Sequence, residues 1–330
     1  MMRIAVLGAG SWGTALAVHL GRIGHDVSLW ARDQALVEEM RARRANAVYL
    51  PDVTLPKSVT VSRDLAEALQ RTSLVVSAIP SHGCRAVIRS AAPHAAAAAV
   101  FVSATKGLEA DTRLRMSDVI AQEVGASHPV VVLSGPSFAS EVAQQLPTAL
   151  VAASTDLAAT ELVQAEFRGP ALRLYGSDDV IGVEVGGAMK NVIAIAAGVV
   201  EGLGLGHNAL AALMTRGLAE VTRLACAAGG RRETLSGLSG LGDLVLTCTG
   251  TLSRNRHVGV ELARGRALPQ ILAGMKMIAE GVRTTDAALA LGAQHGVELP
   301  IAEQMSEVLA GRTQVRAAIE TLMLRKQRAE

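Results

Sequence analysis

The N-terminal stretch Arg3-Ile4-Ala5-Val6-Leu7-Gly8-Ala9-Gly10-Ser11-Trp12-Gly13 decides the fold. Its apolar start predicts a buried strand, and the apolar residues after Gly13 predict a helix. Three glycines in the spacing G-x-G-x-x-G between such a strand and helix are typical of a dinucleotide-binding turn. The first glycine allows a tight turn, the second lets a pyrophosphate approach the backbone, and the third permits close packing of helix on strand. We therefore predict that Gly8, Gly10 and Gly13 bind a dinucleotide.

Further apolar runs, separated by helical stretches, follow this turn in the first half of the chain. This alternation is typical of a parallel sheet covered by helices on both faces. The predicted strands are residues 4–7, 27–30, 74–79, 100–104 and 130–133. Residues 148–152 and 172–175 are candidates to extend the sheet, with a helix over residues 156–167 between them.

The strand signal ends near residue 178, and Ala-, Leu- and Gly-rich segments continue to the C-terminus. The predicted helices are residues 179–200, 208–228, 243–249, 254–264, 282–295 and 314–325. The sequence therefore predicts an α/β plus all-α protein. A doubly wound parallel sheet of Rossmann type forms a dinucleotide-binding domain over residues 1–178, and a helical substrate and catalytic domain follows over residues 179–330.

Composition excludes several classes of protein. A hydrophobic fraction of 50% over 330 residues is sufficient for two cores. The net charge is only +2 and aromatic residues make up 2%, so neither the basic stripe nor the stacking platforms of a nucleic-acid binder are present. Uncharged runs such as residues 91–105 and 191–200 are shorter than the roughly 20 residues that span a bilayer, and we expect no membrane insertion.

Cysteine and histidine spacing gives no metal or disulfide pattern. Cys84, Cys226 and Cys248 lie far apart and form no C-x-x-C pair, which fits a reducing cytoplasm. The eight histidines show no pairing at metal-ligand spacing, so we expect no metal site.

The residues after the second strand bear on the choice of cofactor. An acidic residue about 20 positions after the glycines binds the ribose 2′-hydroxyl of NAD, but here Arg32 precedes Asp33. Arg32 either pairs with the 2′-phosphate of NADP or is a solvated loop residue, with Asp33 capping the next helix. The pattern favours NADP(H), with NAD(H) as a possible cofactor.

Polar residues also follow three other predicted strands. Ligands bind at the carboxyl ends of strands in open α/β sheets, so residues 79–82, 104–107 and 134–137 should face one crevice. Lys106 is the single cation among them. It either faces an anionic ligand there or is solvated at the strand end.

The helical half contains one lysine in an apolar segment. Lys190 has no other charged residue between Glu184 and Glu201. A buried ammonium must find a partner, reach a wet cleft or lose its proton, unless it extends to an interface. Asp243 and Thr247 are four residues apart, hence on one helix face, and are candidates to hold it. Asp243 is otherwise only an N-cap.

A further helix begins at Ser253 and Arg254. A helix N-terminus with a guanidinium in its first turn is suited to clamp a phosphate, although simple capping and surface charge explain the same residues.

Taken in order, several motifs closely resemble the bacterial type of NAD(P)-dependent glycerol-3-phosphate dehydrogenase. They are Gly8–Gly13, the run 104–109, the run 134–139, the run 186–191, the run 240–244 and Ser253-Arg254-Asn255. The resemblance runs over nearly the whole chain. It implies a cytoplasmic oxidoreductase that transfers hydride between NAD(P)H and dihydroxyacetone phosphate, giving sn-glycerol 3-phosphate for phospholipid synthesis.

The resemblance also implies roles for single residues. Lys190 would be the general acid and base, supported by Asp243 and Thr247. The residues expected at the nucleotide, besides the three glycines, are Ser11, Trp12, Arg32, Lys106, Ala139, Arg254, Ile278 and Glu280. The residues expected at the phosphorylated substrate are Lys106, Gly135, Ser137, Lys190, Asp243, Ser253, Arg254 and Asn255.

Two other functions stay open at this point. One is a nucleotide-sensing regulator without turnover, against which Lys190, Asp243 and Arg254 argue. The other is a dehydrogenase for a hydroxyacyl or branched hydroxy-acid substrate, from which a phosphate clamp at Arg254 and Asn255 would distinguish this chain. Apolar residues 192–200 form either a homodimer interface or a core, and we expect a homodimer.

Overall fold

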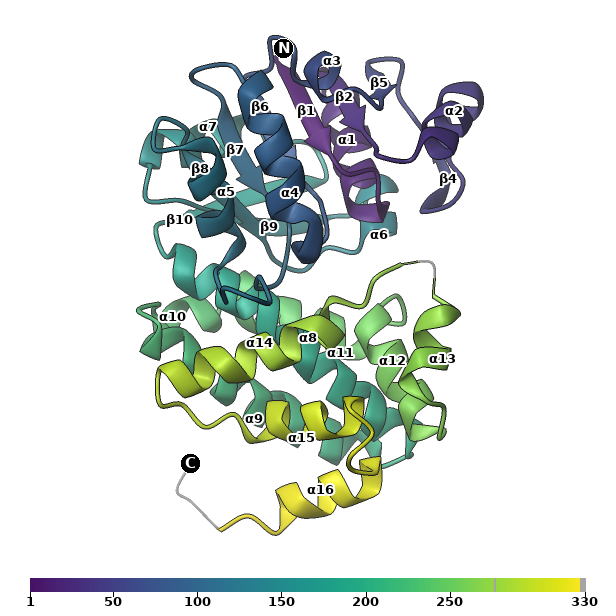
Figure 1. Cartoon of the computed structure of the whole chain (residues 1–330), viewed down its shortest axis with the longest axis vertical. Helices are drawn as coiled ribbons and strands as arrows, with labels where there is room; N and C mark the ends of the chain where they lie inside the picture. Colours follow the sequence, from purple (N-terminus) through teal and green to yellow (C-terminus); the bar gives the residue numbers. More distant parts are fainter. Residues whose placement is uncertain (276, 327–330) are drawn as a thin grey trace.

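The computed structural model describes residues 1–275 and 277–326 of the chain, and it has two parts that meet along one side (Figure 1). The N-terminal part is built on an eight-stranded sheet and the C-terminal part is helical. The sheet strands, in order across it, are β10 (Leu172–Ser177), β9 (Thr148–Ala153), β8 (Val130–Ser134), β7 (Val100–Ser103), β6 (Leu74–Ser77), β1 (Arg3–Leu7), β2 (Asp26–Trp30) and β5 (Val59–Ser62).

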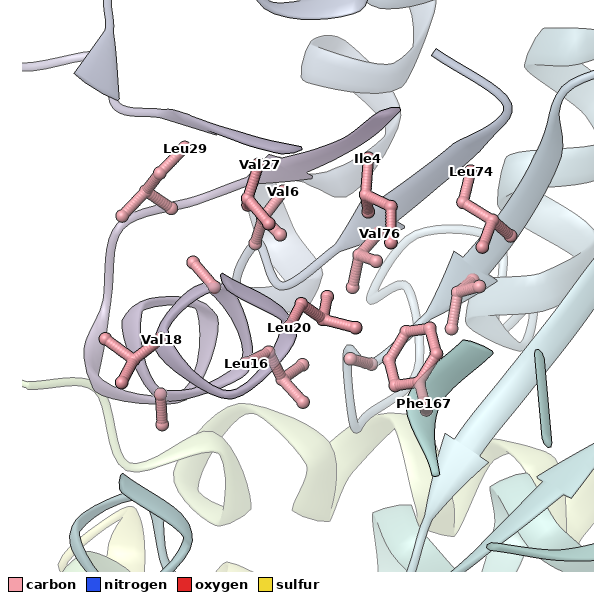
Figure 2. Close-up of a cluster of buried hydrophobic side chains, with 14 of the residues drawn as sticks. Ile4, Val6, Leu16, Val18, Leu20, Val27, Leu29, Leu74, Val76 and Phe167 are labelled. Atoms are coloured by element: carbon pink, nitrogen blue, oxygen red, sulfur yellow. The ribbon is translucent and has the colours of Figure 1, made fainter. Parts of the chain in front are cut away.

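The central strand β1 is buried on both faces, as an apolar parallel strand should be. Ile4 and Val6 join one hydrophobic cluster, whereas Ala5 and Leu7 join another on the opposite face. Helix α1 (Ser11–Arg22) covers the first face through Leu16 and Leu20, as Figure 2 shows. The prediction of a doubly wound sheet is therefore confirmed.

Helices connect the strands on both sides of this sheet. They are α1, α2 (Gln34–Arg43), α3 (Leu65–Leu69), α4 (Ser81–Ala91), a short 3₁₀ turn at Ala92–His94, α5 (Met116–Val124), α6 (Ala139–Ala143) and α7 (Leu157–Phe167). Asp33 and Asp156 cap α2 and α7 by accepting backbone N–H bonds.

Three features of the sheet differ from the prediction. The sheet is not wholly parallel, because β9 runs antiparallel to β8 and β10 then runs parallel to β9. Edge strand β5 pairs with β2, and a hairpin of β3 (Ala45–Asn46) and β4 (Leu50–Thr54) lies apart from the sheet. Neither was predicted, because short polar strands lack the continuous apolar run that marks a buried strand.

The helical part is organised around α8 (Val180–Gly202). This helix packs against α9 (Gly206–Ala227), α11 (Asp243–Thr249), α12 (Arg254–Ala263) and α14 (Glu280–Gln294). The remaining elements are α10 (Arg232–Leu235), a π-helical turn at Leu238–Gly242, α13 (Leu268–Ala273), α15 (Pro300–Leu309) and α16 (Val315–Met323). Helices α10, α13 and α15 were not predicted. Strand β10 ends at Ser177 and α8 begins at Val180, so the domain boundary predicted at residue 178 falls between these two elements.

Helix α8 is long and apolar enough to span a membrane, but 89% of its most apolar window is buried inside the protein. Its residues 192–200 belong to the core of the helical part rather than to an exposed face. Helix α8 contacts strands β8 and β9 of the sheet as well as the helices of the helical part. Side chains of α8 therefore lie at the junction of the two parts.

Candidate active site

The glycine-rich turn has the shape that a dinucleotide phosphate requires. Gly8 adopts a φ of +110°, which side chains rarely allow. A Cβ on Gly13 would lie 1.9 Å from the carbonyl oxygen of Gly8, so this position needs glycine for packing. A Cβ on Gly10 would meet no atom within 4 Å. The space at Gly10 is therefore open to a pyrophosphate, and no side chain caps the N-terminus of α1 behind it. The turn fits a dinucleotide.

A segment from the helical part reaches over to this turn. Ser11 Oγ donates to the sulfur of Met277 at 2.8 Å. The carboxylate of Glu280 accepts from the backbone N–H of Ser81 at 3.3 Å and from its hydroxyl at 2.6 Å. Ile278, expected at the nucleotide, lies between these two contacts and is half-buried. The contacts of Met277 and Ser81 were not predicted, since no motif marks them.

A carboxylate held by two lysines lies where the two parts meet. Asp243, fully buried on α11, accepts from Lys106 Nζ at 2.7 Å and, through its other oxygen, from Lys190 Nζ. Lys190 also donates to Thr247 Oγ1 at 2.9 Å. The predicted association of Lys190 with Asp243 and Thr247 is therefore confirmed. Lys106 comes from the carboxyl end of β7, so each part supplies one ammonium.

Burial changes the acidity of Lys190. Only 9% of its side chain is exposed. Desolvation lowers the pKa of Lys190 to about 7, because burial penalises the charged form more than the neighbouring Asp243 carboxylate favours it, and the Lys106 charge lowers it further. A lysine with this pKa gives up and takes back a proton near neutral pH.

Asp243 is not the N-cap of α11, because the helix begins at Asp243 itself and Gly242 precedes it as cap. The π-helical turn at Leu238–Gly242 leads into Asp243 and directs its carboxylate toward the lysines. A Cβ on Gly240 would lie 2.1 Å from the Leu235 carbonyl oxygen, so this turn depends on glycine.

The loop after β8 lines the same junction. Lys106 Nζ donates to the carbonyl oxygen of Gly135 at 3.1 Å, and Ser137 Oγ donates to the same oxygen at 3.1 Å. Ala139 begins helix α6 just beyond this loop and is half-buried against the core beneath α1. The strand ends at Lys106 and Gly135 are therefore adjacent, and the third predicted strand end lies next to them, because Thr105 Oγ1 donates to the Ile79 carbonyl oxygen at 2.7 Å.

The start of α12 places a cation beside this junction. Ser253 caps α12 by accepting from the Arg256 N–H at 3.3 Å, as predicted. Asn255 donates to the side chain of Asn191, next to Lys190, at 2.9 Å and accepts from the Gly281 N–H at 2.9 Å. Among the described residues, nothing forms an ion pair or hydrogen bond with the Arg254 guanidinium.

The surface of Arg254 is exposed, but nearby protein atoms restrict the hydration of its guanidinium. Desolvation lowers the pKa of its guanidinium, against the opposing effect of the Glu280 carboxylate. A solvent-accessible cation without a partner, in surroundings that restrict its hydration, is suited to receive an anion.

Arg32 lies apart from the lysines, at the carboxyl end of β2, and its side chain is exposed. Asp33 caps α2 by accepting from the Leu36 N–H at 3.0 Å, which confirms the predicted capping role of Asp33. Arg32 lines a cavity of about 530 Å³ at this end of the sheet. No set of three or more histidine, cysteine, aspartate or glutamate side chains in the described ranges is arranged to hold a metal ion.

A buried ion pair joins the two parts of the molecule. Glu184 on α8 accepts from the Ser117 N–H at 2.9 Å and from Arg115 at 3.2 Å, both near the start of α5. Burial raises the pKa of Glu184 against the effect of Arg115. This contact holds the start of α8, and hence Lys190, against the sheet. The only signal for this contact in the sequence is a charged residue within an apolar helix.

Comparison with known proteins assigns the family. Residues 3–160 match the family model of the NAD-dependent glycerol-3-phosphate dehydrogenase N-terminus, and residues 179–320 match that of the C-terminus. This chain belongs to the NAD-dependent glycerol-3-phosphate dehydrogenase family. It is therefore an oxidoreductase of NAD(P), as the sequence predicted.

Bacterial relatives of this family are similar over most of the chain. A glycerol-3-phosphate dehydrogenase [NAD(P)+] of Koribacter versatilis is 56% identical over 83% of this chain and 82% of the relative. The enzyme of that name from Thioalkalivibrio sulfidiphilus is 53% identical over 82% and 81%. The crystal structure of glycerol-3-phosphate dehydrogenase from Coxiella burnetii is 40% identical, with a TM-score of 0.95 over 98% of this chain and 99% of that one.

Proposed function

We propose that this enzyme reduces dihydroxyacetone phosphate to sn-glycerol 3-phosphate with NADPH, in the cytoplasm, as a supply for glycerophospholipid synthesis. The observation that carries the proposal is the buried Lys190 at the junction, held by Asp243 and Thr247 and faced by Lys106. Family membership supports the substrate, because the bacterial relatives are named for glycerol 3-phosphate.

Lys190 is the proposed general acid. When bound, the reduced nicotinamide supplies a hydride to the ketone carbon of the substrate. The ammonium of Lys190 polarises the carbonyl oxygen and then donates a proton to it as negative charge develops. A pKa of about 7 suits this role, since the proton leaves without a large free-energy cost near neutral pH.

The neighbours of Lys190 orient it. Asp243 and Thr247 hold two of its hydrogen-bonding directions, which leaves the third for the substrate oxygen. Lys106 shares the Asp243 carboxylate, and we assign it to both substrate and nucleotide because it lies between the two parts. The loop of Gly135 and Ser137 borders the same place and is assigned to the substrate.

The phosphate of the substrate is proposed to bind at the start of α12. The unpartnered Arg254 guanidinium is the main ligand, and it also borders the nucleotide. Ser253 and Asn255 accompany it. In the structure their side chains cap α12 and join α8 to α14, so we assign them to shaping this anion site as well as to substrate contact.

Nucleotide binding is assigned to the turn of Gly8, Gly10 and Gly13 and to the residues beside it. These are Ser11, Trp12, Arg32, Ala139, Ile278 and Glu280. The indole N–H of Trp12 is buried without a hydrogen-bond partner among the described residues, which supports a polar ligand at this turn. Arg32 supports a preference for NADPH.

A homodimer is the proposed assembly. Residues 192–200, a candidate interface in the sequence, are buried in the core. The support comes instead from Leu241, Val245 and Leu252, large apolar side chains that are 39–52% exposed around α11. Sedimentation velocity tests this assembly, and a monomer at micromolar concentration would contradict it.

The reaction is tested by mixing the purified enzyme, NADPH and dihydroxyacetone phosphate and following the absorbance of the reduced nicotinamide. A decrease that depends on the substrate is expected. A flat trace with NADPH and with NADH would favour the nucleotide-sensing regulator. If the enzyme reduced the keto form of a hydroxyacyl or branched hydroxy-acid compound but not dihydroxyacetone phosphate, this result would contradict the phosphate site at Arg254.

A further inference from the structure

The cavity beside Arg32 is lined by two further arginines. It has a volume of about 530 Å³ and lies at the carboxyl ends of β2 and β5. Arg32 follows β2, Arg63 follows β5, and Arg41 extends from α2. We call this cavity the arginine pocket. The sequence pattern indicated only Arg32 as a ligand here, because β5 was not predicted as a strand of the sheet.

Backbone contacts hold the three arginines together. Strands β2 and β5 pair in parallel with Trp30 opposite Ser62, so the residues after them emerge side by side. Trp30 Nε1 donates to the Arg63 carbonyl oxygen at 2.8 Å, and Arg63 Nε donates to that of Arg32 at 3.4 Å. Arg41 Nε donates to the Val61 carbonyl oxygen at 2.8 Å. The Nε groups of Arg63 and Arg41 are therefore held by the protein, and their outer nitrogens make no hydrogen bond within the part of the chain that the structure describes.

The positive charge of the pocket is not neutralised by ion pairs. No salt bridge connects Arg32, Arg41 or Arg63 to an acid within residues 1–275 and 277–326. The two acids that also line the cavity have other partners. Asp64 accepts the N–H groups of Ala66 and Glu67 at the start of α3, and Glu67 accepts the hydroxyl of Ser62. Three cations face two engaged carboxylates, which favours a dianionic ligand.

The pocket adjoins the dinucleotide turn. The Gly8 N–H donates to the Trp30 carbonyl oxygen at 3.0 Å, so the turn after β1 and the end of β2 are in direct contact. In a dinucleotide whose pyrophosphate lies at the α1 N-terminus, the adenosine ribose extends toward the end of β2. The chemical group of the cofactor that brings a dianion to this place is the 2′-phosphate of NADP.

We propose that Arg63 and Arg41 bind the 2′-phosphate together with Arg32, and so are specificity-determining residues for NADPH. The inference rests on the proposed use of NADPH. Arg63 is the central member, because its Nε is directed at the backbone of Arg32 and its position follows the strand that pairs with β2. Three guanidinium groups surround one phosphate from three elements of the fold.

Calorimetric titration with adenosine 2′,5′-bisphosphate and with adenosine 5′-monophosphate tests this inference without turnover. The two ligands differ only in the 2′-phosphate. The variants are Arg32→Gln, Arg41→Gln and Arg63→Gln. Arg43→Gln is the matched control, because Arg43 lies on the same helix as Arg41 and pairs with Glu39 outside the pocket.

We expect Arg63→Gln to weaken the bisphosphate about 10-fold and Arg41→Gln about 3- to 10-fold, because each removes one charge-assisted contact at an accessible site. Affinity for the monophosphate should change less than about 2-fold in every variant. Arg43→Gln should match the wild type with both ligands. A variant that is merely destabilised should lose affinity for both ligands by the same factor. The ratio of the two affinities is therefore the deciding measurement.

The outcomes separate this inference from the proposed function. If Arg32→Gln weakens the bisphosphate but Arg63→Gln and Arg41→Gln match Arg43→Gln, the inference is overturned and NADPH use stands. If the wild type binds both ligands equally, the preference for NADPH and the inference are both overturned. If Arg63→Gln loses the discrimination in a protein that does not reduce dihydroxyacetone phosphate, the inference is supported and the proposed reaction is overturned.

Discussion

Replacement of Lys106 should move the pH dependence of the reaction for which Lys190 is the proposed acid. The pKa of Lys190 is lowered from 10.5 to about 7, first by burial and then by the charge of Lys106, against Asp243. At 1.36 kcal/mol per pKa unit this difference corresponds to a loss of about 5 kcal/mol in the preference for the charged form. Reduction needs the charged form, so its kcat should be highest below pH 7 and fall as the pH rises through the pKa.

Lys106→Met removes the second ammonium from Asp243. The repulsion then disappears and the carboxylate is left to Lys190 alone, so both effects raise the pKa of Lys190. Unit charges about 4 Å apart interact by about 4 kcal/mol at an effective dielectric constant of 20. Relaxation and salt reduce this value, and we expect the falling limb of the kcat profile to move up by about one pH unit.

The assay measures kcat for reduction with saturating substrates from about pH 6 to about pH 9. The reverse oxidation, which needs neutral Lys190, should rise over the interval in which reduction falls. Lys190→Arg retains a cation that cannot be deprotonated, and should lower kcat about 100-fold or more at every pH. If the limbs of the wild type and Lys106→Met coincide, Lys190 is not the group that titrates and the proposed acid is wrong.

Three further predictions test the phosphate site, the turn and a buried acid. Arg254→Ala should raise KM for dihydroxyacetone phosphate by about 10-fold or more and Arg254→Lys by less, while unphosphorylated dihydroxyacetone loses little; equal losses with both substrates would remove Arg254 from the phosphate. Gly10→Val should abolish nucleotide binding in calorimetry at an unchanged unfolding temperature, whereas Gly13→Val should lower that temperature, since only the second added side chain meets protein atoms; destabilisation by both would contradict an open turn. Burial raises the pKa of Glu220 from 4.5 to about 7, so between these values the native state binds more protons and the wild type loses up to about 3 kcal/mol of stability as pH rises. Glu220→Gln keeps an acceptor for the Ile301 N–H and should lose less over that interval in urea unfolding, and parallel curves for the two proteins would refute this.

The buried elements of the fold were predictable from the sequence because continuous apolar runs indicate them. Strand β1 and helix α8 were placed to within two residues at their ends. Strand β5 and the β3–β4 hairpin were not, because Val59–Ser62 alternates with polar residues and Ala45–Asn46 is too short to show a period. The direction of β9 was also beyond the sequence, since strand direction follows from the length and course of the connection around α6.

The sequence predicted those residues of the candidate site whose side chains are unusual for their surroundings. A lysine in an apolar helix is costly, so Lys190 stood out before any partner was known. Arg63 has no such signal, because an exposed arginine after a polar strand resembles any surface charge. Its place beside Arg32 depends on the pairing of β2 with β5, which is a tertiary property.

The arrangement of the two lysines places the proposed proton donor at the junction between the two parts of the molecule. Lys106 belongs to the sheet and Lys190 to the helical core, yet both bind one carboxylate. If the two parts moved apart, Lys106 would leave Asp243 first, and the pKa of Lys190 would rise toward its ordinary value. The proton would then be held too firmly for efficient donation. If Lys190 is the acid, as proposed, an acid matched to neutral pH therefore requires the two parts to be in contact, and the same arrangement places the glycine-rich turn beside the proposed substrate site.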